Sequence, residues 1–214
     1  TTVSRFLPRL ALNRAVAQLG LTDIDGGDPD ALVQRSLQRL YRNQNSDGGF
    51  GWWSTDESDP AVTAYVLIGF GEAKRGGYAV DAFAEEQAVS YLLGQLDLSR
   101  DVMLPAYDLR AYMLYAMAEA GHPQLSRTMA LAEQRASLSN TAKAWIVIAL
   151  GDAGIDGTDP RLTALMSDLQ STAIASATGN HWEEDTYTPD VFGDSTQATA
   201  QVLQAFTRFQ PEHP

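Results

Sequence analysis

The chain has 214 residues, of which 44% are hydrophobic and 20% charged, a balance typical of a globular domain with a sizeable core. Its net charge of −12, from 27 acidic and 15 basic residues, disfavours nucleic acid and anionic lipid as partners. The absence of cysteine excludes disulfides, thiolate metal sites and a cysteine nucleophile. No apolar run reaches the roughly 20 residues that a membrane span needs, so no membrane insertion is expected.

Helices of two kinds are predicted to alternate along the chain. Amphipathic segments indicate outer helices, whereas segments that are apolar on nearly every side and share an Ala-aromatic-x-aliphatic pattern indicate inner helices. In chain order they are 28–44 (outer), 63–73 (inner), 81–96 (outer), 110–120 (inner), 123–137 (outer), 143–153 (inner), 159–175 (outer) and, with a looser match, 199–209 (inner). Alternation of period two appears nowhere at length, so β structure is barely supported.

Local signals mark the helix ends. Asp28, Asp59 and Asp159 each precede a proline and are expected to be N-caps. Glycines at positions 20, 76, 121 and 154 are expected to end helices. The inner helices are expected to bury Ala64, Tyr65, Leu67, Ala111, Tyr112, Leu114, Ala144, Trp145 and Val147.

The loop QNSDGGFGWWSTDESDP, residues 44–60, joins the first outer helix to the first inner helix. A structural interpretation has Gln44 capping the outer helix while Phe50, Trp52 and Trp53 fill the gap to the inner helix. The alternative is that the same loop borders a reactive face.

Carboxylates leave an enzyme hypothesis open, because helical toroids also host glycosidases, which need two acids on either side of a bond. Candidate acids are Asp47, Asp56, Glu57 and Asp59 in the loop and Glu183, Glu184 and Asp185 in the segment HWEED. A helical-repeat binding module is a third hypothesis. Stacked inner and outer helices alone fit either an open solenoid or a closed α/α toroid.

Several stretches carry a resemblance to a known family. The opening TTVSRFLP, then QNSDGGFGWW, then SDPAVTAYVLIGFGEAKRGGY and HWEED are similar to the thioester-containing domain of the α2-macroglobulin and complement superfamily, especially its bacterial members. The match runs in order over nearly the whole chain. The opening octet and residues 44–78 are its more specific parts.

The resemblance implies an all-α fold, an α/α toroid of alternating helices, as a single domain over 1–214 that is a fragment of a larger protein and incomplete at its C-terminus. It implies a protease inhibitor, a single-use covalent trap rather than an enzyme, with no catalytic residue in this chain, no cofactor and no metal. The thioester would form between Cys and Gln of a Cys-x-Glu-Gln motif just upstream. Residues Thr1, Thr2 and Ser4 would flank it, and the loop candidates for its pocket are Phe50, Trp52, Trp53, Asp56 and Glu57.

The expected partners are proteases, bound covalently by the parent protein, and neighbouring domains of the same polypeptide. The resemblance also implies a periplasmic or extracellular location at the cell envelope. Many complement-type members carry a histidine in the loop that matches 44–60, but this sequence has none there. Its absence predicts that the parent favours attack by amines over attack by hydroxyls.

Overall fold

The computed structural model describes residues 2–4, 7–8, 10, 29–98, 107–177, 179–184, 194–210 and 212. The chain divides into two compact units, Thr1–Asp97 and Leu98–Pro214. In the described ranges all regular structure is helical except for one two-stranded hairpin, which confirms the all-α class. None of the described helices is both long enough and apolar enough to cross a membrane. The single domain expected over 1–214 stays a prediction.

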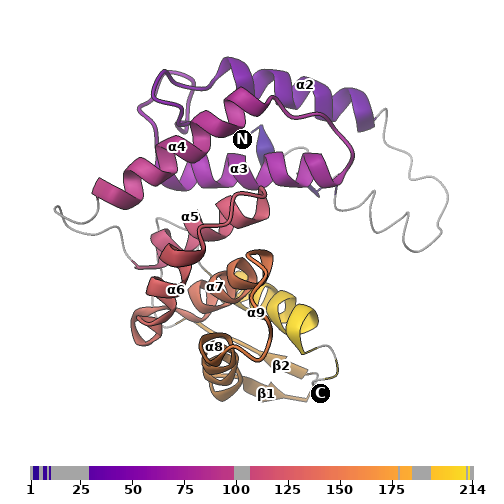
Figure 1. The fold of residues 1–214 in the computed structure, drawn as a ribbon. Helices are drawn as coiled ribbons and strands as arrows, with labels where there is room; N and C mark the ends of the chain where they lie inside the picture. Colours follow the sequence, from indigo (N-terminus) through magenta and orange to yellow (C-terminus); the bar gives the residue numbers. More distant parts are fainter. Residues whose placement is uncertain are drawn as a thin grey trace. The chain divides into compact units, whose positions relative to one another are not determined.

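The first unit contains α2 (Pro29–Arg42), α3 (Pro60–Arg75) and α4 (Ala82–Leu98). Figure 1 shows α2 and α4 lying beside α3. The α3 helix is the buried element, with Ala64, Leu67 and Phe70 fully buried. Phe70 contacts Tyr41 of α2 at a ring distance of 5.9 Å, so the core of this unit is built around α3.

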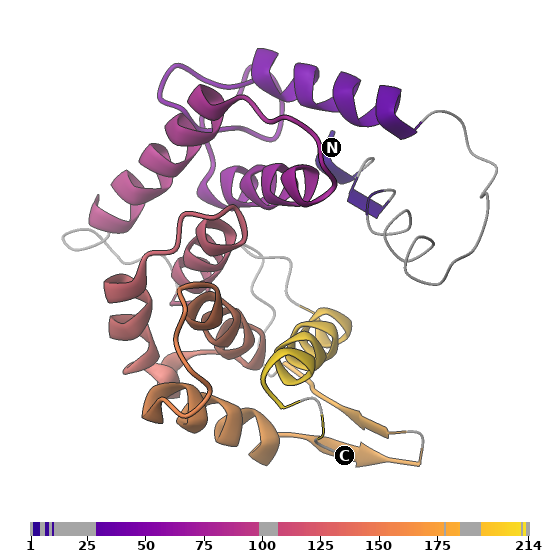
Figure 2. The same ribbon diagram turned by 45° about the vertical axis from the view of Figure 1, so that its right-hand side comes forward.

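The second unit is arranged around a central helix. It contains α5 (Tyr107–Glu119), α6 (Leu125–Ala132), a 3-10 turn (Arg135–Ser137), α7 (Asn140–Asp152), α8 (Pro160–Ser171), strands β1 (Ile174–Ser176) and β2 (Gly179–His181), and α9 (Ser195–Phe209). The α7 helix packs against α5, α6, α8 and α9, as both views of the ribbon show (Figures 1 and 2). Its side chains from Ala144 to Leu150 are all buried.

The observed helices confirm the predicted alternation. The expected inner segments correspond to α3, α5, α7 and α9, and the expected outer segments to α2, α4, α6 and α8. Of the nine side chains expected inside, eight are buried. Tyr65 is the exception, because it is only half-buried.

The predicted helix ends are right at most of the described positions. The Asp59 carboxylate accepts from the Val62 N–H at 2.9 Å and that of Asp159 from the Arg161 N–H at 2.8 Å. Gly121 and Gly154 have φ of 93° and 83°, as a left-handed helix end requires. Gly76 is the C-cap of α3, as predicted, and the residue after it, Gly77, has the positive φ of 84°. Asp28 and Gly20 lie outside the described residues.

The hairpin was missed, because 159–175 was expected to be helix throughout. The α8 helix ends at Ser171, and Ile174 pairs with His181 in antiparallel register. The next residue, Trp182, is buried and donates its indole N–H to the Leu169 carbonyl at 2.6 Å. This contact holds the returning strand against the end of α8, and it joins residues whose pairing no local pattern indicates.

Replacing Trp145 by alanine tests the inner-helix assignment. The Trp145 ring is 1% exposed and lies 4.8 Å from the ring of Tyr112 and 6.1 Å from that of Tyr115. Removing it leaves a cavity among packed rings, so the free energy of unfolding is expected to fall by about 3 to 5 kcal/mol. Urea denaturation measures this. Lys143→Ala, at a partly exposed position of the same helix, is the control and is expected to change stability by less than about 0.5 kcal/mol. Equal effects of the two changes would contradict the assignment.

Candidate functional site

The base of the loop between α2 and α3 is part of the core. Phe50 is 2% exposed, and its ring meets that of Phe70 edge-on at 6.3 Å. Its backbone N–H donates to the Thr63 hydroxyl at 2.9 Å, and its carbonyl accepts from the Asp59 N–H at 2.9 Å. The Thr63 hydroxyl in turn donates to the Asp59 carbonyl at 2.8 Å. The first turn of α3 therefore fixes the position of Phe50, and the expectation that this ring fills the gap is confirmed.

Amide side chains close the other side of the loop. Asn45 donates to the Asp56 carbonyl and to the Ser58 hydroxyl, both at 3.0 Å. Gln44 donates to the Gly48 carbonyl at 2.9 Å and to the Ala84 carbonyl of α4 at 2.8 Å. The expectation that Gln44 caps the outer helix was wrong: its amide fastens the loop to the next outer helix instead.

The two buried glycines of the loop permit its close approach to α4. Gly48 has φ of 88°, and a β-carbon there would lie 2.4 Å from the Gln87 carbonyl oxygen. Gly49 donates its N–H to the Asp47 carboxylate at 3.0 Å, and the same oxygen accepts from Ser58 at 2.7 Å. The glycines are therefore needed for both the backbone turn and the contact with α4.

The tip of the loop faces solvent. Trp52 is 47% exposed and Trp53 76% exposed, so the expectation that these rings fill the gap was wrong. Asp56 accepts from the Trp53 N–H at 3.2 Å and donates its own N–H to the Trp53 carbonyl at 3.2 Å. Residues 53–56 thus form a turn that places Trp53 at the exposed tip of the loop. Phe50, at the base of the loop, lies in the core. Asp56 is half-buried and Glu57 is exposed.

Tyr91 of α4 closes the loop from the side. Its hydroxyl donates to the Ser58 carbonyl at 2.9 Å. Burial raises the pKa of Tyr91 to about 12, and the carboxylates of Asp47 and Asp59 contribute in the same direction. A neutral phenol therefore holds the loop at neutral pH. Sequence reasoning missed this residue, because nothing local to position 91 refers to the loop.

Two of the described N-terminal residues, Ser4 and Leu10, lie beside helix α3. Val3 and Leu10 are buried, Thr2 is half-buried and Ser4 is exposed; Thr1 lies outside the described residues. Ser4 forms a side-chain hydrogen bond with Tyr65, whose pKa is raised by burial and lowered in part by this bond. Leu10 reaches the end of α3, where its Cδ2 would lie 3.2 Å from a β-carbon added to Gly76. Ser4 and Leu10 therefore lie beside α3, one in its first half and the other at its C-cap.

The loop base and Ser4 meet α3 on different sides. Thr63, which holds Phe50, and Tyr65, which holds Ser4, are two residues apart, so their side chains leave the helix in directions about 160° apart. Of the predicted site residues, Phe50 and Ser4 are therefore anchored to the same part of α3 but on different sides of it. Tyr65 was predicted as a core residue only, and its contact with Ser4 was missed.

Of the acids of HWEED that the structure describes, Glu184 binds the start of helix α7 through its carboxylate. Glu184 accepts from the Thr141 N–H at 2.7 Å, from the Thr141 hydroxyl at 2.5 Å and from the Asn140 N–H at 3.3 Å. Glu183 lies on the surface, with an oxygen 3.6 Å from His181 Nε2. Asp185 lies outside the described residues. A carboxylate that accepts three hydrogen bonds at a helix start is explained by capping, which removes the main acid of this group from the glycosidase hypothesis.

Proteins similar in sequence include two from bacteria. The α2-macroglobulin of Thermotoga maritima is 33% identical over 91 residues, which cover 42% of this chain and 6% of that protein. The α2-macroglobulin of Rickettsia conorii is 28% identical over 97 residues, which cover 44% of this chain and 5% of that protein. The matched stretch is thus a small part of these much longer relatives. No family model matches the chain.

Solved structures extend the likeness to nearly the whole chain. Native α2-macroglobulin from Escherichia coli, spanning domain MG7 to the C-terminus, aligns with 99% of this chain and 34% of its own, with a TM-score of 0.76 and 21% identity. Salmonella α2-macroglobulin reacted with methylamine aligns with 97% of this chain and 14% of its own, at 0.73 and 21%. Trypsin-activated α2-macroglobulin from Escherichia coli aligns with 90% and 13%, at 0.66 and 19%.

At these identities the structures show the fold, which is the predicted α/α-toroid class of alternating inner and outer helices. The sequence matches and the structural alignments are both with bacterial α2-macroglobulins. The chain is similar in sequence to bacterial α2-macroglobulins over part of its length and shares their fold over nearly all of it, which confirms the predicted resemblance.

Replacing Gly48 by alanine tests the close approach of the loop to α4. Gly77→Ala is a matched control, since Gly77 has a similar φ of 84° but a β-carbon added there would have no atom within 4 Å. Both changes place a side chain in the left-handed region, at a cost of about 1 to 2 kcal/mol. Gly48→Ala must also displace the backbone of α4, so thermal or urea unfolding is expected to show about 1 to 3 kcal/mol of further loss. Equal losses in the two variants would refute the contact.

Alkaline titration tests the contact of Tyr91 with the loop. The folded protein favours the neutral phenol, so this contribution to stability is complete below pH 10, the ordinary pKa of tyrosine, and is lost as pH rises to about 12. Urea unfolding between pH 9 and pH 12 is expected to show a steeper fall in stability for the native sequence than for Tyr91→Phe. The difference in absorbance at 295 nm between the two proteins follows the ionisation itself. Parallel stability curves would count against the assigned pKa.

Proposed function

We propose that this chain is part of the thioester domain of a bacterial macroglobulin-like protease inhibitor, and that the full-length parent traps attacking proteases covalently. The single observation that carries the proposal is the fold shared with bacterial α2-macroglobulins over nearly the whole chain. The opening octet and the glycine- and aromatic-rich loop support the thioester domain in particular. The chain itself contains no cysteine, so the reactive bond belongs to the parent.

The proposed chemistry is acyl transfer. In the parent, the thioester joins a cysteine sulfur to the side-chain carbonyl carbon of a glutamine-derived residue. A lysine amine of the protease attacks that carbon, the carbon–sulfur bond breaks, a thiolate leaves and an amide bond forms with loss of a proton from the amine. Each parent molecule reacts once. No turnover, metal or cofactor is part of this scheme.

Two of the aligned structures support these reactants. One is an α2-macroglobulin reacted with methylamine, a primary amine as a lysine side chain is, and another is activated by trypsin. Such a thioester has to be kept from water until a protease cuts the parent and its domains move. This requirement favours contact between the present chain and neighbouring domains of the same polypeptide.

Within this proposal Thr1, Thr2 and Ser4 flank the thioester, and the loop candidates Phe50, Trp52, Trp53, Asp56 and Glu57 border its surroundings. Their positions suggest different tasks. Ser4 is tied to Tyr65 and Phe50 is part of the core, so these two position the backbone, whereas Trp52, Trp53 and Glu57 are accessible to a neighbouring domain. We place the parent in the periplasm or outside the cell, where it meets foreign proteases.

The preference for amines is the testable part of the chemistry. No histidine lies between Gln44 and Pro60, so this loop cannot form the acyl-imidazole that leads to ester bonds. We expect the full-length parent, after activation with trypsin, to hold the enzyme by amide bonds. Treatment of the denatured conjugate with hydroxylamine at alkaline pH is expected to release little of the bound trypsin, measured by gel electrophoresis.

Two controls separate the parts of the proposal. The 214-residue chain alone, incubated with trypsin or methylamine, is expected to gain no mass, since it contains no cysteine. Parent treated first with methylamine is expected to form no conjugate with trypsin. Release of most trypsin by hydroxylamine refutes the amine preference while leaving the trap intact. Absence of any conjugate, with no Cys-x-Glu-Gln in the parent sequence, refutes the trap itself.

A further inference from the structure

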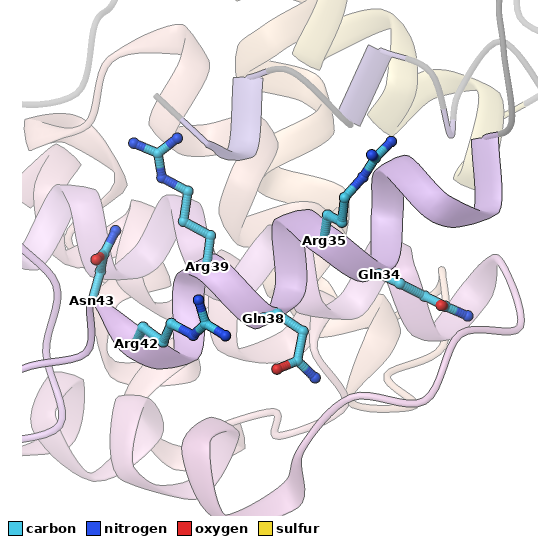
Figure 3. Close-up of a pocket in the computed structure, with 6 residues that line it drawn as sticks. All are labelled: Gln34, Arg35, Gln38, Arg39, Arg42 and Asn43. Atoms are coloured by element: carbon cyan, nitrogen blue, oxygen red, sulfur yellow. The ribbon is translucent and has the colours of Figure 1, made fainter.

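The exposed face of α2 carries an unusual row of cations for such an acidic chain. Arg35, Arg39 and Arg42 are all exposed and follow one another at spacings of four and three residues, which places them along one side of the helix. The opposite side is the core side, where Val33, Leu37 and Leu40 are buried. The three arginines and their amide neighbours line one open hollow, seen in Figure 3: Gln34, Arg35, Gln38, Arg39, Arg42 and Asn43. We call these six residues the α2 basic face.

The arginines of the α2 basic face form no ion pair with any described acid. Several other cations in the described ranges pair with acids: Lys74 with Glu85, Arg75 with Glu72, Arg135 with Asp168, Arg161 with Glu133 and Arg208 with Asp152. Acids outnumber bases by 27 to 15, so an arginine that pairs with none of the described acids is the less expected case in this chain. Three of them on one helix form a local site of positive charge.

The position of the arginines within α2 explains only part of this arrangement. Cations in the last turn of a helix interact favourably with its dipole, which accounts for Arg39 and Arg42. Arg35 lies a full turn earlier, where its Nε donates to the Ala31 carbonyl at 3.0 Å. Like charges at spacings of three and four residues repel one another. An anionic partner would remove that repulsion.

We propose that the α2 basic face is a docking site for an acidic segment of another polypeptide. Guanidinium groups form bidentate hydrogen bonds with carboxylates. The three amide side chains near the arginines can form hydrogen bonds with backbone peptide groups. Polynucleotides are less suited, because the six residues include no aromatic ring for base stacking. A second copy is also disfavoured, since each carries a charge of −12.

Binding of defined probes to the 214-residue chain tests the site. The probes are a fluorescein-labelled peptide of alternating glutamate and alanine and a labelled oligothymidylate of equal length, followed by fluorescence anisotropy at low salt. Arg39→Gln/Arg42→Gln is expected to weaken peptide binding about tenfold, as expected for the loss of two exposed ion pairs. Arg75→Gln/Arg135→Gln is the matched control; it removes the same charge from two other exposed arginines and is expected to leave peptide binding unchanged. Circular dichroism verifies that both double variants are folded.

Each alternative outcome decides against the proposal. Absence of peptide binding to the native sequence, or equal weakening in the two double variants, shows that the α2 basic face is only a solvated helix surface. Tighter binding of the oligothymidylate assigns it to polynucleotides. Self-association at low salt that is lost in Arg39→Gln/Arg42→Gln, measured by analytical ultracentrifugation, assigns it to a second copy of the chain.

Discussion

A helix that is apolar on every side has to be surrounded, and this constraint determines the rest of the structure. In the second unit, α7 meets it through contact with α5, α6, α8 and α9. Small side chains such as Ala144 let neighbouring helices approach α7, while large ones such as Trp145 fill the space between them. The outer helices α6 and α8 among them need only one apolar face. Connections are consequently left at the helix ends, where the loop of residues 44–60 is found.

The same constraint explains which parts of the fold were predictable from sequence. Burial on all sides leaves a local signature, so the alternation of inner and outer helices and most of the interior side chains could be inferred. Side-chain contacts between residues far apart in the chain leave no such local signature. Gln44 bonds to Ala84, Tyr91 to Ser58 and Trp182 to Leu169, and each of these decides the course of a loop or hairpin. The errors at Gln44, at Trp52 and Trp53, and in the hairpin all concern such long-range contacts or the exposed end of a loop.

Several carboxylates in this chain accept hydrogen bonds from backbone N–H groups, a role that residue counts do not reveal. Asp59, Asp159 and Glu184 accept N–H groups at helix starts, and Asp47 serves a turn in the same way. A pair of catalytic acids needs oxygens that face a common substrate, which these caps do not offer. The acidic surplus is therefore poor evidence for hydrolytic chemistry. Three exposed arginines on one side of α2 pair with none of the described acids in spite of this surplus.

The base and the tip of the loop of residues 44–60 differ in how far the fold constrains their side chains. Its base is held by Thr63, Asn45 and Tyr91 through buried or half-buried hydrogen bonds, so changes there affect the stability of the first unit. Its tip, with Trp52 and Trp53, is exposed, so side chains there can change without disturbing the core. A histidine at the tip would therefore be tolerated by the fold. Packing at the tip therefore does not account for the absence of histidine from residues 44–60.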